Sequence, residues 1–303
     1  MEFSINKDLK KYFSLYNYYR FIAKKIGYNL IIDKMVKPIS FHELSKIKGV
    51  NLEYFDINKS EYKLWVKKYY PDWESQFGCI FHKKLIEFYI TFSFLTPKPD
   101  DIFMDAAGAV NSYISNLKCK KKYLQDNRIP QSIRAKLGND IHYIESDGGS
   151  IPLSNRSVDK ISCHHSFEHF QEFSDILFIN EIQRLLRPKG KCCIIQVFIG
   201  DRFIELTDAI TLKKKFDGRS KRVIDPSSIL PGGRNCGNFA RIYDVKTFQE
   251  RVIEKIDLLK FNVTISELRL DRQNIPDLTL DCHKHVTSIN RPYRAMTIER
   301  ISD

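Results

Sequence analysis

Three histidines and Glu168 occur close together in the segment SCHHSFEHFQEF, which begins at Ser162. Histidine titrates near neutral pH and can accept a proton from a hydroxyl group while that hydroxyl attacks an electrophile. We therefore expect acid–base chemistry here, with His165 as the favoured base and His164, Glu168 and His169 as the other candidates. The alternative is that the Glu-His pair braces its loop. The same residue types can bind a metal ion, but their spacing does not predict ligands that converge on one ion, so we assign no metal.

The elements that must position these residues form a regular pattern from Asp101 onward. Short apolar runs, DIFMDAAG, KKYLQD, DIHYIESD, VDKISCHHS and KCCIIQVF, alternate with helix-like segments. The clearest helix covers 175–186 and is stopped by the Pro and Gly of RPKG. This alternation predicts right-handed crossovers and an α/β, Rossmann-like doubly wound fold, with a mostly parallel seven-stranded sheet and a ligand at the carboxyl ends of its strands. Strands over 261–268 and 293–301 are expected to form an antiparallel hairpin at one edge, after a helix over 244–259.

The composition divides the chain into two parts. Residues 1–96 are rich in Tyr and Lys and contain helical stretches, which predicts a helical N-terminal cap or lid. Residues 97–303 hold the alternating pattern, and the two prolines of PKP indicate the boundary. Within this second part, the segment around 200–243 is long for a connection between a strand and a helix, so we interpret it as a lid insertion.

The charge of the chain indicates an anionic partner. The formal net charge is +12, and the excess is concentrated in KCKKK and KKKFDGRSKR. A phosphorylated sugar, a nucleotide, a nucleic acid or a membrane surface would fit this charge. In the insertion, Arg234 and Arg241 could hold phosphate or carboxylate by paired hydrogen bonds, and with Tyr243 they are the candidate substrate-binding residues. The alternative is a solvated surface with incidental lysines and arginines.

The sequence shows no features of a membrane or secreted protein. The N-terminus, MEFSINKDLKKYF, is charged, and the apolar run over 85–95 is interrupted by Glu87 and too short to cross a bilayer. The seven cysteines include no CxxC pair, which favours reduced thiols over a disulfide framework. We expect a globular cytoplasmic protein without a transmembrane segment.

Four consecutive elements resemble the class I S-adenosylmethionine-dependent methyltransferases, in particular the methyltransferase type 11-like group that acts on small molecules and sugars. The elements are FMDAAGAVNSY, KKYLQD, IESDGGSIPLSNRSVDKI, and SCHHSFEHFQEF followed by INEIQRLLRPKGKCCII. The resemblance implies that S-adenosyl-L-methionine is the cofactor. It also implies that the methyl acceptor lies beside the loop after the fourth strand.

The first of these elements corresponds to the family's acidic residue and glycine-rich loop. The resemblance implies that Asp105, Ala107, Gly108 and Ala109 contact the methionine part of the cofactor. Small residues suit this place because the backbone must approach the ligand closely. The sequence departs from the family here, since Ala107, Ala109 and Asn111 stand where glycines are usual.

The other elements imply the remaining cofactor contacts. A carboxylate at a strand end, here Asp126, can accept hydrogen bonds from both ribose hydroxyls, although such an aspartate can also be a helix cap. The resemblance places Asp147 beside the adenine amino group, Gly148 beneath the adenine ring, and the loop that carries His164 beside the sulfonium.

The predicted function is O-methylation of a sugar, a nucleotide-linked sugar or a surface glycan. One alternative is an RNA methyltransferase. The charge and the abundant Tyr favour it, but the sequence contains no recognisable RNA-binding motif. Another is a catalytically degenerate methyltransferase fold that serves as a binding or scaffold protein, because the usual glycines are missing. The expected partner is a small-molecule or glycan acceptor, which can be anionic. Nucleic acid is disfavoured, and a homo-oligomer is compatible with the sequence.

Overall fold

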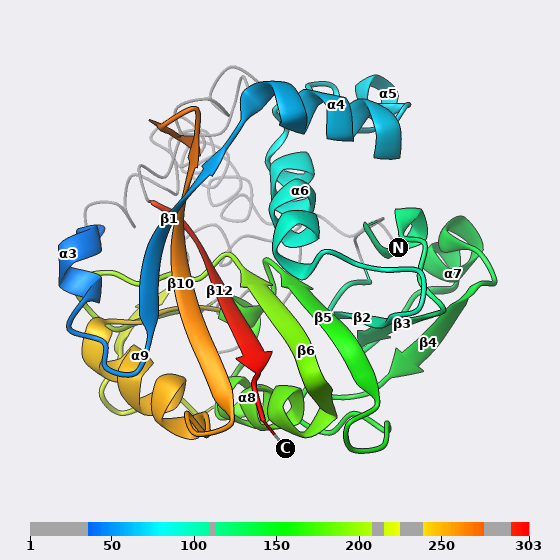
Figure 1. The fold of residues 1–303 in the computed structure, drawn as a ribbon. Coiled ribbons are helices and arrows are strands. Elements are labelled where there is room, and N and C mark those ends of the chain that lie inside the picture. The colour runs from blue at the N-terminus through cyan, green and yellow to red at the C-terminus, as the bar shows by residue number, and fades with distance from the viewer. Residues whose placement is uncertain (1–35, 110–112, 208–214, 225–238, 276–291, 303) are drawn as a thin grey trace, which may run out of the picture.

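The main sheet of the protein has eight strands along one path, in the order β1-β10-β12-β6-β5-β2-β3-β4 (Figure 1). The computed structural model describes residues 36–109, 113–207, 215–224, 239–275 and 292–302. Neighbouring strands are parallel, except that β12 is antiparallel to both β6 and β10 and the short β11 is antiparallel to β10. The bounds are β1 Asn51–Ile57, β2 Ile102–Ala106, β3 Lys121–Asp126, β4 Ile141–Glu145, β5 Val158–His164, β6 Leu186–Ile195, β10 Phe261–Leu270, β11 Gln273–Asn274 and β12 Tyr293–Arg300.

This topology confirms the predicted Rossmann-like, mostly parallel fold and the antiparallel pairing of β10 with β12. It differs in one respect, because β1 lies outside β10 and forms the edge of the sheet. The segment predicted as a helical cap therefore also supplies an eighth strand. Its sequence, NLEYFDI, is mostly exposed or half-buried and lacks the continuous apolar run by which buried strands can be recognised.

Helices cover both faces of the sheet. The side chains of β6 show how, because Cys192 and Ile194 pack in the core cluster that includes α8, whereas Cys193 and Ile195 pack in the cluster that includes α4 and α6. Burial on both faces explains why this strand is a continuous apolar run. The helices are α3 Phe41–Leu44, α4 Lys59–Tyr69, α5 Trp73–Phe77, α6 Lys83–Leu95, α7 Gln131–Leu137, α8 Ser174–Leu185 and α9 Val245–Arg251, with 3-10 turns at Tyr113–Asn116, Phe167–His169 and Ile253–Lys255.

The predicted stop of the helix before the fifth strand takes a different form. Helix α8 ends at Leu185 and β6 begins directly at Leu186, so RPKG lies inside the strand. The register between β5 and β6 shifts there, and Lys189 has a positive φ of 66°. A Cβ at Gly190 would lie 2.8 Å from the carbonyl oxygen of Arg187, which requires glycine. Pro and Gly thus form a bulge rather than a separate turn.

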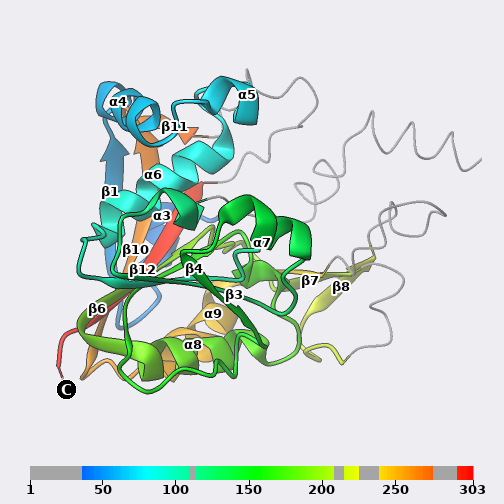
Figure 2. The same cartoon turned by 90° about the vertical axis from the view of Figure 1, so that its right-hand side faces the viewer.

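The insertion around 200–243 contains a second, three-stranded sheet in the order β8-β7-β9. The strands are β7 Ile204–Thr207, β8 Lys221–Ile224 and β9 Ala240–Ile242. Figure 2 shows β7 and β8 projecting to one side of the main sheet. That this insertion is a lid, and that 1–96 caps the site, stay predictions, and Arg234 lies outside the described residues.

The cysteines differ from the expectation of reduced thiols in one case. Cys79 is disulfide-bonded, whereas Cys119, Cys163, Cys192 and Cys193 are free. Sequence spacing could not indicate this because the fold can bring distant cysteines together. Among the helices that the structure describes, none combines the length and the apolar character needed to cross a membrane.

Candidate active site

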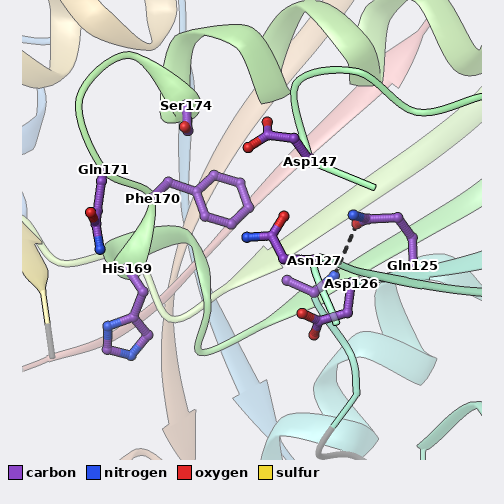
Figure 3. A pocket seen from close by; sticks show the side chains of 10 residues that line it. Gln125, Asp126, Asn127, Asp147, His169, Phe170, Gln171 and Ser174 are labelled. Atoms are coloured by element: carbon purple, nitrogen blue, oxygen red, sulfur yellow. Dashed lines mark hydrogen bonds between the residues drawn. The ribbon is translucent and has the colours of Figure 1, made fainter. Parts of the chain in front are cut away.

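A pocket of about 190 Å³ lies where β2, β3, β4 and β5 end (Figure 3). The carboxyl ends of parallel strands meet at one edge of a sheet, which is why residues from four separate runs converge here. Ligands of doubly wound folds bind at this edge. The pocket is lined by Ala107, Gln125, Asp126, Asn127, Asp147, Gly148, His169, Phe170, Gln171 and Ser174.

The loop after β2 is fixed by hydrogen bonds to the end of β3. The amide of Ala107 donates to Gln125 Oε1 at 3.3 Å, and the amide of Ala109 donates to Asp126 Oδ2 at 3.1 Å. Ala107 has a φ of 50°, in the left-handed region that glycine adopts more easily. An alanine there costs about 1–2 kcal/mol, so the loop keeps a glycine-like backbone although the sequence departs from the glycine-rich pattern.

Gly108 is a position of this loop where a side chain does not fit. A Cβ would lie 2.4 Å from Asp105 Oδ2 and 2.9 Å from Leu124 Cδ1. We expect Gly108→Ala to lower the free energy of unfolding by about 1–3 kcal/mol, because overpacking displaces buried groups. Urea unfolding followed by circular dichroism measures this. Gly218→Ala is the control, since nothing lies within 4 Å of a Cβ there. An equal loss of free energy of unfolding in both variants would contradict the claim that a side chain does not fit at Gly108.

Asp105 and His164 lie in the core beneath the pocket rather than in its lining. Asp105 Oδ1 accepts a hydrogen bond from Ser162 Oγ at 2.6 Å and lies 3.3 Å from His164 Nδ1. The other ring nitrogen of His164 lies 2.9 Å from Thr91 Oγ1, and its ring packs against Tyr113. Since His164 is 1% exposed, the structure corrects its predicted contact with cofactor and acceptor. Side chains alternate along β5, and His164 points toward α6.

Asp126, Asp147 and Gly148 line the pocket, and their contact with the cofactor stays a prediction. Burial raises the pKa of Asp126 above its ordinary value, although backbone amides, that of Ala109 first, oppose this. Asp147 is exposed, and its Oδ1 accepts a hydrogen bond from the amide of Gly149 at 2.7 Å. Figure 3 shows the ring of Phe170 between the loops that carry these carboxylates. A Cβ at Gly148 would lie 3.4 Å from that ring, so Gly148 lets the ring lie against the backbone.

Five pocket-lining residues were not predicted from the sequence: Gln125, Asn127, Phe170, Gln171 and Ser174. Gln125 is 1% exposed, and its amide bridges the loop after β2 and the loop after β4, because Nε2 donates to the carbonyl of Ser146 at 2.6 Å. Its position directly before Asp126 was the available signal. Phe170 follows the histidines, and its place in the pocket could not be predicted because an aromatic residue at this point is equally typical of the hydrophobic core.

His165 belongs to a different group of side chains at the same edge of the sheet. Its Nδ1 lies 3.1 Å from Glu168 Oε1, and its Nε2 lies 2.8 Å from Glu87 Oε1. The hydroxyl of Tyr293 donates to the same Glu87 oxygen at 2.7 Å, and Lys84 Nζ lies 3.1 Å from the other. Glu87 and Tyr293 were missed, although Glu87 is conspicuous as a charge within an apolar run. We call Glu87, His165, Glu168 and Tyr293 the His165 cluster.

Charge in the His165 cluster favours the imidazolium. Burial by itself lowers the pKa of His165, but the carboxylates of Glu87 and Glu168 outweigh this, so the pKa is raised. Burial alone raises the pKa of each carboxyl group, and His165 outweighs that effect, so both are lowered. His165 must therefore lose a tightly held proton before it can act as a base.

The loop after β5 joins the His165 cluster to the pocket. Ser166 Oγ donates to the carbonyl of Ala107 at 3.0 Å, which connects this loop to the loop after β2. His169 lies at the pocket, with its side chain half exposed and its Nδ1 against the carbonyl of Phe239. The three histidines thus diverge. Within the described ranges, no three His, Cys, Asp or Glu side chains are grouped as metal ligands would be.

Arg241 and Tyr243 lie in the interior rather than in an open substrate site. Arg241 Nη1 lies 2.8 Å from Asp175 Oδ2, and its Nη2 lies 2.9 Å from Glu205 Oε1. The Tyr243 hydroxyl donates to Asp175 Oδ2 at 2.7 Å. Both residues are at most 1% exposed, so the structure corrects their predicted contact with substrate. Sequence alone could not show that α8 and α9 cover them.

Residues 114–194 match a family model described as a methyltransferase domain. The matched region contains β3 to β5 and most of β6, and it includes every pocket-lining residue except Ala107. The match indicates S-adenosylmethionine as the cofactor. No curated protein matches the chain.

Several solved structures are similar in fold. They include a 1,6-didemethyltoxoflavin-N1-methyltransferase from Burkholderia thailandensis, with 15% identity, a TM-score of 0.44, and coverage of 88% of this chain and 95% of that chain. Phosphoethanolamine N-methyltransferase 1 from Haemonchus contortus has 13% identity, a TM-score of 0.45, and coverage of 80% and 49%. YcgJ from Bacillus subtilis has 13% identity, a TM-score of 0.34, and coverage of 38% and 52%. The chain spans about half the length of the last two.

Proposed function

We propose that this chain transfers the methyl group of S-adenosylmethionine to a hydroxyl group of a small acceptor, such as a sugar, a nucleotide-linked sugar or a glycan. The observation that carries the proposal is the convergence of the loop after β2, Asp126 at the end of β3 and Asp147 after β4 on one pocket. The methyltransferase-domain match over 114–194 supports the reaction type. The hydroxyl acceptor is favoured because histidine and carboxylate side chains, which can take up its proton, lie beside that pocket.

The residues of the pocket suit the parts of this cofactor. Asp126 is a half-buried carboxylate, which hydrogen-bond donors stabilise, and ribose hydroxyls are such donors. The exposed carboxylate of Asp147 can accept from an exocyclic amine, and Phe170 and Gly148 offer a flat apolar surface for a ring. Ala107, which precedes Gly108, lines the pocket and is the proposed contact of this loop with the methionine part. The chemistry that the cofactor supplies when bound is an electrophilic methyl group on a sulfonium.

The His165 cluster is the proposed acid–base group. The acceptor oxygen forms the bond to the methyl carbon, the carbon–sulfur bond breaks with its electron pair on sulfur, and the hydroxyl proton passes to the cluster. The hydrogen bond from Ser166 to Ala107 ties the loop of His165 to the loop at the cofactor pocket. Holding acceptor and methyl group together supplies most of the acceleration in such a displacement.

Calorimetric titration with S-adenosylmethionine and S-adenosylhomocysteine tests the cofactor site. We expect both to bind, and we expect Asp126→Asn to weaken binding about 10–100-fold, because it removes the charge from a hydrogen-bonded acceptor. Asparagine can still accept from the amide of Ala109, so the loop should remain in place.

Asp140→Asn is the matched control. Asp140 lies just before β4, pairs with Lys122, and has a side chain that is 66% exposed. We expect wild-type affinity in this variant. No binding of either compound by the wild-type chain, or equal weakening in both variants, would contradict the proposed function.

A further inference from the structure

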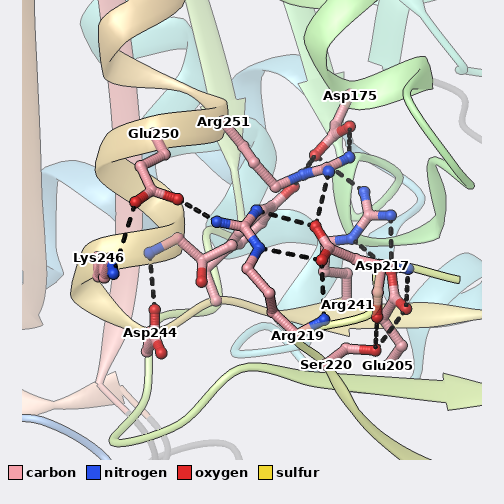
Figure 4. Close-up of polar contacts among 12 residues, drawn as sticks. Asp175, Glu205, Asp217, Arg219, Ser220, Arg241, Asp244, Lys246, Glu250 and Arg251 are labelled. Atoms are coloured by element: carbon pink, nitrogen blue, oxygen red, sulfur yellow. Dashed lines mark hydrogen bonds and ion pairs between the residues drawn. The ribbon is translucent and has the colours of Figure 1, made fainter.

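A buried ionic cluster joins the three-stranded sheet to helices α8 and α9 (Figure 4). Arg241 of β9 contacts Asp175 of α8 and Glu205 of β7, and Arg251 of α9 contacts the same Asp175 through Nη2 at 2.7 Å. The two arginines and Asp175 are at most 4% exposed. We call Asp175, Glu205, Arg241 and Arg251 the arginine cluster.

The arginine cluster also holds one wall of the cofactor pocket. Arg241 Nη1 donates to the carbonyl of Phe170 at 2.9 Å, and its Nη2 donates to the carbonyl of Glu172 at 3.1 Å. Arg251 Nη2 donates to the same Glu172 carbonyl. These carbonyls belong to the segment 169–174, whose His169, Phe170, Gln171 and Ser174 line the pocket. Two guanidinium groups from other elements thus fix the backbone of this segment, which we call the pocket wall.

Stability alone does not account for this cluster. Removing two guanidinium groups and their carboxylates from water costs more than burying apolar side chains of similar size, so such clusters contribute little net stability. What a guanidinium offers instead is five donors in a fixed plane, which can bridge two carbonyls and two carboxylates at once. The geometry of the pocket wall is what these donors determine.

We propose that Arg241 and Arg251 are positioning residues for the cofactor pocket, through which the three-stranded sheet holds the wall at residues 169–174 in its binding conformation. The inference rests on the proposed function, because it takes the pocket as the cofactor site. The role proposed for Arg241 differs from the one predicted from the sequence, because its guanidinium group binds the protein backbone rather than a substrate.

Arg241→Lys and Arg251→Lys test the proposal. Lysine keeps the positive charge, but its single nitrogen cannot bridge carbonyl and carboxylate oxygens. We expect the dissociation constant for S-adenosylhomocysteine to rise about tenfold or more in each variant, because hydrogen bonds to the pocket wall are lost. Amide hydrogen exchange should accelerate at 169–174 beyond any change in the rest of the chain.

Arg219→Gln is the matched control. Arg219 pairs with Asp217 and Glu250 at the rim of the same network, its side chain is 52% exposed, and within the described ranges it makes no hydrogen bond to the pocket wall. Wild-type affinity and wild-type exchange at 169–174 are expected in this variant.

Lysine variants that bind and exchange like the wild type overturn the inference, and so does a uniform loss of protection with unchanged affinity, which marks a merely structural role. If the wild-type chain fails to bind S-adenosylhomocysteine, the proposed function fails. Hydrogen exchange then decides the positioning role by itself: selective acceleration at 169–174 in the lysine variants supports it, and its absence overturns it.

Discussion

Asp175→Ala is expected to lower the free energy of unfolding by about 3–5 kcal/mol, because it removes one partner of a buried ionic cluster. Asp175 is fully buried, and its two oxygens receive the guanidinium groups of Arg241 and Arg251 and the hydroxyl of Tyr243. Without it, both arginines remain buried with fewer carboxylates, and the hydroxyl loses its acceptor. Urea unfolding followed by circular dichroism measures the loss.

Two further variants sharpen this result. Asp175→Asn keeps the volume of the side chain and isolates the effect of its charge, so its loss should be smaller. Glu299→Ala removes an exposed carboxylate that lies 3.7 Å from Lys191, and exposed pairs of this kind contribute about 0–1 kcal/mol. If Asp175→Ala lost no more than Glu299→Ala, the arginines would not depend on Asp175.

The central strands of the fold can be predicted from sequence because they are buried on both faces. Runs such as KKYLQD and KCCIIQVF are short, apolar and bounded by turn residues, and their alternation with helices leaves few possible topologies. β1 could not be predicted in the same way, because an edge strand with exposed residues carries no such run. Its place beside β10 depends on contacts between segments that are far apart in the chain.

In the candidate site too, residues marked by a local sequence pattern could be predicted, and residues brought in by tertiary contacts could not. The position of Asp126, Asp147 and Gly148 at the pocket could be predicted because they lie at or just after the carboxyl ends of recognisable strands. Glu87 and Tyr293 could not, since α6 and β12 reach the His165 cluster only through the tertiary fold. Adjacent residues can also have different surroundings. At the end of β5, His164 is buried in the core whereas His165 belongs to the His165 cluster, and sequence does not show which of the two side chains turns inward.

His165→Asn is expected to reduce the rate of methyl transfer about 10²–10⁴-fold, the range for loss of a positioned acid–base group. The measurement is transfer of labelled methyl groups to an acceptor found by screening sugars and nucleotide-linked sugars. His142→Asn is the control, because His142 is an exposed residue of β4. A similar rate in His165→Asn and His142→Asn would remove His165 from the chemistry.

The pH dependence of His165 follows from its two carboxylate neighbours. Its pKa is raised above 6.5 because Glu87 and Glu168 outweigh the effect of burial. His165 therefore keeps its proton to higher pH than an ordinary histidine, and the methyl-transfer rate should increase as the pH rises through the raised pKa. Glu87→Gln removes one of the two charges, so both the His165 pKa and the rise in rate should move to lower pH. Titration of the His165 ring by NMR checks the pKa without any acceptor. A His165 pKa at or below 6.5 in the wild-type chain, or one unchanged by Glu87→Gln, would show that these carboxylates do not hold the proton, and the rate would then have no reason to depend on them.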